Sequence, residues 1–215
     1  FGGVSTSTVQ VFTIAVNAVN DTPVFSTGSN QIVNEDAGAQ MVENWATGIS
    51  AGVANESEQL VTFVVDNNSH GLFSVQPAVS STGTLTFTPA ADAFGVATVD
   101  VILTDDGGTA YGGVTSSTVQ SFTITIRPVN DAPLFSTGSN QIVNEDAGAQ
   151  TVENWATGIS AGAENESDQV LQFTVSSSTP ALFAVQPSVS TSGTLVYTPA
   201  DNAFGVATVD VVLTD

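Results

Sequence analysis

The side chains with the clearest chemical potential are carboxylates that recur at fixed places along the chain. The 215 residues include 21 Asp and Glu against a single Lys or Arg, which gives a formal net charge of -20. The pair Glu35-Asp36 returns as Glu145-Asp146, and Glu56 returns as Glu166. Hard cations prefer such oxygen ligands, and calcium takes about six to eight of them. The acidic clusters therefore predict calcium binding, with a solvated acidic surface that only maintains solubility as the alternative.

The charge balance and composition also exclude several classes of partner and site. Phosphate groups are bound by Lys and Arg, so the acidity disfavours nucleic acid and, equally, anionic membranes. No run of about 18 apolar residues exists, so we expect no insertion into a membrane. Cysteine is absent, which removes disulfides, thiol catalysis and zinc sites built on thiolates.

The single histidine is the main argument against catalysis. His70 has Pro180 as its equivalent in the second half of the chain, so a Ser-His-Asp triad cannot be repeated there. A pair of carboxylates could in principle hydrolyse glycosides. The acidic pairs, however, fall where cation binding between domains would need them. We therefore expect that the protein is not an enzyme.

A repeat with an offset of 110 residues positions these acidic groups. Residues 24–50 return as residues 134–160, and the alignment runs without a gap from Phe1/Tyr111 to Asp105/Asp215. Roughly 70% of the 105 aligned pairs are identical. This period is too long for a solenoid turn or a propeller blade, and it matches an immunoglobulin-size sandwich of ~100 residues. The repeats are therefore expected to be whole domains in tandem.

Alternating apolar segments inside each repeat predict strands. They are rich in β-branched and aromatic residues, and clusters of Gly, Asn, Ser and Pro separate them at intervals of about 8–12 residues. The fold class is therefore all-β, as tandem Ig-like, Greek-key β-sandwiches. Trp45 and Trp155 are expected in the cores rather than on a sugar-binding face. The expected strands cover residues 9–16, 60–65, 72–75, 84–87, 96–103 and 119–126.

Two proline-containing segments, residues 19–23 and 129–133, are the expected linkers. Proline ends a strand because it lacks the N–H donor and fixes φ. Residues 1–18 are then the last strand of a preceding repeat, residues 22–130 are one complete sandwich, and residues 132–215 are a second sandwich without its last strand. Either the chain is an excerpt of a longer array, or residues 1–18 of one chain complete the open sandwich of the next and form a head-to-tail fibre.

The linker and the acidic segments resemble the cadherin-like tandem domains of large bacterial surface adhesins. The segment Val129-Asn130-Asp131-Ala132-Pro133 is similar to the cadherin linker pattern Asp-x-Asn-Asp-Asn-x-Pro-x-Phe. Leu103-Thr104-Asp105-Asp106-Gly107 resembles the Ala-x-Asp-x-Gly segment, and Asn34-Glu35-Asp36 resembles the early glutamate motif. The linker departs from the pattern at its first Asp, where Arg127 or Pro128 stands.

This resemblance implies one calcium cluster at each junction between domains. The ligands carried over by position to the central cluster are Glu35, Asp92, Asn130, Asp131, Glu166, Asp168 and Asp215. Those carried over to the N-terminal cluster are Asn20, Asp21, Glu56, Glu58 and Asp105.

The function expected from these features is structural. The chain would be an extender repeat of a secreted or cell-surface bacterial adhesin, stiffened by calcium, with neighbouring repeats of the same protein as its partners. One alternative is a subunit of an extracellular filament that assembles by strand donation. Another is a polysaccharide-binding module that recognises a glycan or cell-surface ligand.

Overall fold

The computed structural model describes all residues, 1–215. Its regular elements are strands and short 3-10 helices, so the predicted all-β class is confirmed. No helix in it has the length and apolar character needed to cross a membrane. The chain divides into two compact units. The first unit comprises Phe1–Ile32, Ala37–Pro89 and Val96–Thr125, and the second comprises Val33–Asp36, Ala90–Gly95 and Ile126–Asp215.

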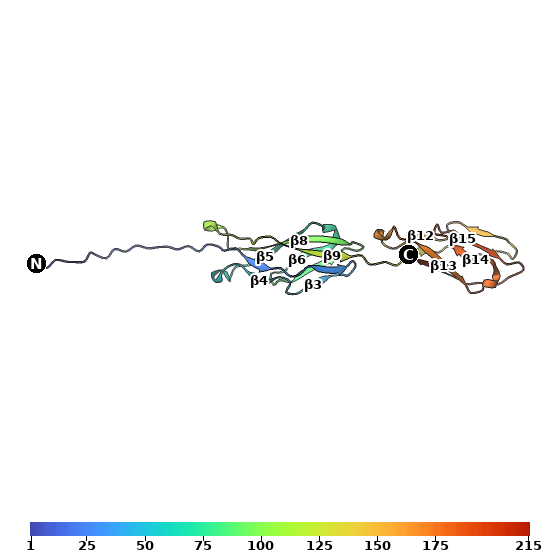
Figure 1. Ribbon diagram of the computed structural model, residues 1–215, viewed down its shortest axis with the longest axis horizontal. Coiled ribbons are helices and arrows are strands. Elements are labelled where there is room, and N and C mark those ends of the chain that lie inside the picture. Colours follow the sequence, from blue (N-terminus) through green and yellow to red (C-terminus); the bar gives the residue numbers. More distant parts are fainter. The chain divides into compact units, whose positions relative to one another are not determined.

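The first repeat forms two layers of strands (Figure 1). Its sheets have the orders β2-β9-β8-β5, β3-β7-β6 and β1-β4. The neighbours β5 and β8 are far apart in sequence and antiparallel, as are β3 and β7, so the chain crosses between layers as in a Greek-key sandwich. The strands are β1 Val24–Ser26, β2 Gln31–Asn34, β3 Gln40–Val42, β4 Thr47–Ser50, β5 Val61–Asn67, β6 Phe73–Val79, β7 Leu85–Pro89, β8 Gly95–Asp105 and β9 Gln120–Arg127.

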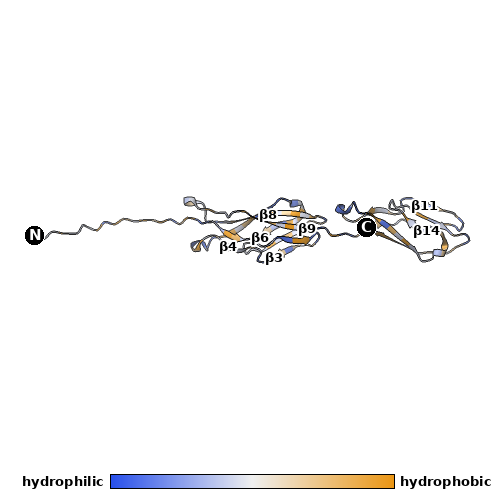
Figure 2. Ribbon diagram, viewed as in Figure 1, coloured by the Kyte–Doolittle hydropathy of each residue, from blue (hydrophilic) through white to orange (hydrophobic).

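The core of this sandwich follows from the alternation of apolar residues, which are the orange stretches of the strands in Figure 2. Val101 and Leu103 of β8 are fully buried, as the period of two predicts. Phe25 of β1 meets Phe63 of β5 edge to face, with ring centroids 5.0 Å apart, which joins the two layers. Trp45 is buried in the core, as predicted.

The second repeat contains seven strands that match those of the first. Their sheets have the orders β10-β12, β11-β15-β14 and β13-β16. Residues 141–144, which are equivalent to β2, form no strand, and β16 is the last strand of the chain described. The strands are β10 Leu134–Ser136, β11 Gln150–Val152, β12 Thr157–Ser160, β13 Gln172–Ser177, β14 Phe183–Val189, β15 Leu195–Pro199 and β16 Val209–Thr214.

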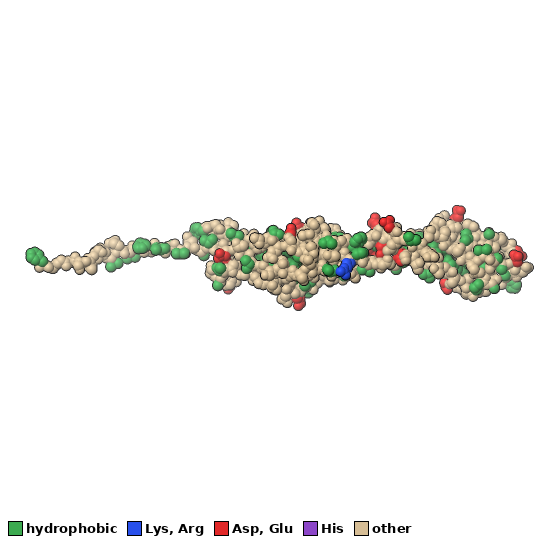
Figure 3. Space-filling view, in the orientation of Figure 1, with side chains coloured by type: hydrophobic (Ala, Val, Ile, Leu, Met, Phe, Trp, Pro, Cys, Tyr) green, Lys and Arg blue, Asp and Glu red, His purple; other side chains and the backbone are tan.

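The N-terminal segment is the main departure from the expected strands. Residues 1–23 form no strand, and Figure 3 shows apolar side chains exposed along the segment. The strand expected over residues 9–16 is therefore absent, because a strand needs a hydrogen-bonded neighbour and this segment has none. The assignment of residues 1–18 to a preceding repeat stays a prediction.

Two leucines of the first repeat give a direct test of its core. Leu85 in β7 is fully buried, whereas Leu60 beside β5 is 73% exposed. Leu85→Ala should lower the free energy of unfolding by about 2–5 kcal/mol, because it leaves a cavity. Leu60→Ala should change it by less than about 0.5 kcal/mol. Urea titrations followed by circular dichroism measure both, and equal midpoints for the two variants would contradict this packing.

Candidate metal centre

Glu35, at the end of β2, is a carboxylate held in the interior of the second unit. Its side chain is 2% exposed. Oε1 accepts hydrogen bonds from the backbone N–H of Val129 at 2.8 Å and from Nδ2 of Asn165 at 3.4 Å. Oε2 is buried and has no hydrogen-bond partner. A buried acceptor without a partner costs about 1–3 kcal/mol, and more when it is charged, so this oxygen is suited to a cation.

Asp131 and Glu166 supply two further oxygens of the same kind. The backbone N–H of Asp131 donates to Oε1 of Glu166 at 2.9 Å, and Glu166 is 7% exposed at the end of the 3-10 helix η4 (Glu164–Glu166). Glu166 Oε2 and Asp131 Oδ2 are buried without partners. A glycine leaves room for them, because a Cβ on Gly162 would lie 2.5 Å from Glu166 Oε2 and 2.8 Å from the Cβ of Asp131.

Asp131 also belongs to a triad with Asp36 and Asp92. Each of the three offers a carboxylate oxygen within 4.8 Å of the others. Asp36 and Asp92 are exposed and have positive φ of 60° and 55°, a conformation that Asp tolerates better than most residues. The backbone N–H of Asp92 donates to Oδ1 of Asp36 at 3.4 Å, which holds the two turns together. The triad could bind a metal ion.

The electrostatics of Asp131 reflect this crowding of acids. Partial burial, and then the negative charges of Glu166, Asp92, Asp36 and Glu35, raise the pKa of Asp131 above its ordinary value. Both causes disfavour the charged form. A bound cation would favour that form instead, so the arrangement is strained at neutral pH without one and relieved with one.

Two amide side chains extend the centre. Gln169 donates from Nε2 to Oδ1 of Asn130 at 2.8 Å, and Asn130 donates from Nδ2 to Oδ2 of Asp215 at 3.3 Å. Gln169 Oε1 is buried without a partner. Neutral amide oxygens are common calcium ligands, so this oxygen adds to the carboxylates as a donor.

The first unit repeats this arrangement with equivalent residues. Asp21 donates its backbone N–H to Oε1 of Glu56 at 2.9 Å, and Gln59 donates to Oδ1 of Asn20 at 2.8 Å. Asn20 in turn donates from Nδ2 to Oδ1 of Asp105 at 2.9 Å. Glu56 Oε2, Gln59 Oε1 and Asp105 Oδ2 are buried without partners. The same geometry therefore arises from each repeat independently.

The ligand sets carried over from the resemblance omit three of the residues that this geometry brings in. Gln59, Gln169 and Asp36 contribute oxygens, whereas Glu58 and Asp168 are exposed at the surface. For the two glutamines the reason is local. Each follows a 3-10 helix and a turn rather than a strand, so it shares a face with Glu56 or Glu166 three residues earlier. The repeated spacing Glu-x-x-Gln was the available signal.

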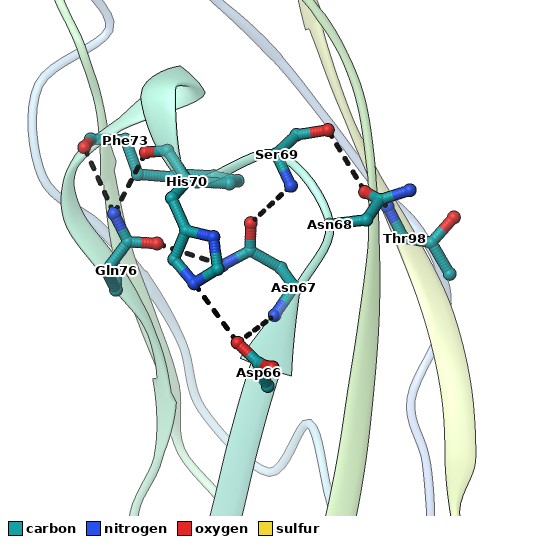
Figure 4. A network of polar contacts seen from close by, with 8 residues as sticks. All are labelled: Asp66, Asn67, Asn68, Ser69, His70, Phe73, Gln76 and Thr98. Atoms are coloured by element: carbon teal, nitrogen blue, oxygen red, sulfur yellow. Dashed lines mark hydrogen bonds and ion pairs between the residues drawn. The ribbon is translucent and has the colours of Figure 1, made fainter.

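A second network of polar side chains, which are hydrogen-bonded to one another, surrounds Asn67 (Figure 4). Asn67 is buried at the end of β5, where Nδ2 donates to Oε1 of Gln76 at 2.9 Å and Oδ1 accepts from the N–H of Ser69 at 2.9 Å. His70 lies 3.1 Å from Asp66 through Nε2. The amide nitrogen and the amide oxygen of the buried Asn67 therefore each have a hydrogen-bond partner.

In comparisons with known proteins, no protein-family model matches this chain, and no curated protein matches its sequence. Among solved structures, the crystal structure of the human desmocollin-1 ectodomain matches with a TM-score of 0.32 and 11% sequence identity. The match covers 92% of this chain and 37% of that structure.

The raised pKa of Asp131 gives a pH test. The folded protein binds the proton of the Asp131 carboxyl more tightly than the unfolded chain does. This difference stabilises the fold at pH values below the ordinary carboxylate pKa, and the stabilisation is lost as the pH rises through the raised pKa of Asp131. In the presence of chelator, the melting temperature of the wild type should therefore gain a contribution from Asp131 when the pH is lowered from neutral to mildly acidic. Asp131→Asn should reduce this gain. Asp201→Asn, at an exposed position, is the control. Identical pH profiles for Asp131→Asn and the wild type would contradict the crowding.

Proposed function

We propose that the chain is a structural extender of a secreted or cell-surface bacterial adhesin, with calcium fixing the linkers between its domains. The observation that carries this proposal is a set of three buried carboxylate oxygens without partners, which belong to Glu35, Asp131 and Glu166. They lie in the unit that also holds the triad of Asp36, Asp92 and Asp131.

The donor set favours calcium over other cations. All candidate ligand atoms are carboxylate or amide oxygens, which hard cations prefer, and cysteine is absent while the single histidine lies in another cluster. Magnesium demands a near-ideal octahedron and usually retains several waters. Three carboxylates with oxygens within 4.8 Å of one another, and further buried oxygens without partners in the same unit, suit the larger and less regular coordination of calcium.

The sequence origin of the ligands supports a role at the linker. Glu35, Asp36 and Asp92 belong to the first repeat, Asp131 to the linker, and Glu166 to the second repeat. A cation that binds all of them stabilises the arrangement in which the three segments meet, by RT ln(1 + [L]/Kd). The linker would then lose rotational freedom, which is what a stiff extender requires.

The repeats offer little support for a binding face of their own. Trp45, the best candidate for stacking on a sugar, is 2% exposed and packs against Phe122. Neighbouring domains with roughly 70% identical residues also suit a spacer better than a dedicated receptor-binding domain. The proposed partners are therefore neighbouring repeats of the same protein, in an extracellular setting where calcium is plentiful.

Calcium titration tests this proposal. Calcium should raise the melting temperature of the wild type, by a stabilisation of about 2.7 kcal/mol at a hundredfold excess over Kd. Glu166→Gln should lose most of that gain, because it removes one charged oxygen from the centre. Differential scanning calorimetry in calcium and in chelator measures the effect. Small-angle scattering of the same samples should show a stiffer particle in calcium.

The matched control is Glu153→Gln, which removes the same charge from an exposed position of the same unit. This variant should keep the full response to calcium. Superimposable melting curves of the wild type in calcium and in chelator would refute the proposed function. An equal calcium response in Glu166→Gln and Glu153→Gln would refute the site.

A further inference from the structure

The only Lys or Arg side chain of the chain lies at the start of the linker. Arg127 is the last residue of β9, and its exposed side chain is drawn in blue in Figure 3. Serine proteases of the trypsin class select the residue before the cleaved bond through a pocket that holds a basic side chain. The bond between Arg127 and Pro128 is therefore the one bond in these 215 residues that such a protease can select.

A cut at this bond would have a large effect, because the bond lies between the two repeats. Residues 127–130 are exposed and residues 128–133 form no strand. Exposed segments of this kind are the preferred sites of proteolysis. Cleavage after Arg127 would leave Glu35 in one fragment and Glu166 in the other, so it would divide the candidate metal centre.

The proline that directly follows the arginine opposes this cleavage. In the protease, a histidine must give its proton to the nitrogen that leaves as the bond breaks. In Pro128 that nitrogen carries a ring carbon instead of a hydrogen, so the ring crowds the space through which the histidine approaches. The ring also restricts the preceding residue, Arg127, to extended conformations. No other type of residue at position 128 would impose both restrictions.

The linker of the preceding repeat offers a comparison within the same chain. Asn17 stands at the position equivalent to Arg127, and Ala18 stands at the position equivalent to Pro128. The three residues that follow are Val-Asn-Asp in both linkers. The proline is thus present in the linker that has a basic residue and absent from the linker that has none. This difference fits a proline whose role is tied to the arginine.

We propose that Pro128 is a protective residue, which prevents proteases of the trypsin class from cutting the linker after Arg127. With this bond protected, the chain contains no bond that those proteases accept. The protection is a property of the bond itself. It therefore persists when the segment opens transiently, which is the state in which proteases usually attack a folded protein.

The fold adds a second protection around the same bond. The backbone O of Arg127 accepts a hydrogen bond from the N–H of Glu35 at 2.9 Å, and the N–H of Val129 donates to Oε1 of Glu35 at 2.8 Å. A protease can bind this segment only after these contacts open locally. A cation bound at Glu35 would suppress the opening, a step that rests on the proposed calcium function.

Trypsin digestion of the 215-residue protein and two variants tests the proposal, with fragments followed by gel electrophoresis and intact mass. The wild type should stay intact, both folded and in urea above its unfolding midpoint. Pro128→Ala should be cut once, into residues 1–127 and 128–215, both in urea and when folded in chelator. Pro133→Ala is the matched control and should stay intact, because it removes a nearby proline that follows Ala132 rather than a basic residue.

Two outcomes would overturn the role of Pro128. Cleavage of the wild type in urea would show that the fold alone protects the bond. A folded Pro128→Ala that stays intact in chelator would show that the contacts of Glu35 suffice without the proline.

Calcium provides a separate readout in the same assay. At a hundredfold excess over Kd, calcium should lengthen the half-life of folded Pro128→Ala by up to about a hundredfold, because the cation must leave before the segment opens. Rapid cleavage of Pro128→Ala with equal half-lives in calcium and in chelator would still support the protective role of Pro128. It would count against the proposed calcium function alone.

Discussion

The structure depends most on a constraint at the linker, where carboxylates are buried next to one another without compensating charge. Glu35 and Glu166 each have one oxygen satisfied by a backbone N–H and one oxygen without a partner. The satisfied oxygen fixes the orientation of each carboxylate, and the other is left free to accept a ligand. Gly162 keeps the space beside them open. The N–H bonds, the glycine and the turn residues with positive φ all serve this one arrangement.

The recurrence of the arrangement in the first unit shows that local sequence builds it. Glu56 accepts the N–H of Asp21 at the same distance at which Glu166 accepts that of Asp131. Roughly 70% of the aligned residues are identical between the repeats, so about three in ten differ while this arrangement is kept. The short 3-10 helix, the linker Asn-Asp and the end of the penultimate strand therefore suffice to orient these side chains, without the segment 33–36 that completes the second unit.

Much of the fold was predictable, because a period of two and a domain-size repeat are strong signals. Strands β5 to β9 lie where the alternation predicts them, and the burial of Trp45 follows from its apolar surroundings. The site was predictable only in part. Glu58 and Asp168 are exposed because a 3-10 helix presents every third residue, and Gln59 and Gln169 therefore face the carboxylates. Residues 9–16 have the pattern of a strand but no neighbouring strand, and pattern alone cannot supply one.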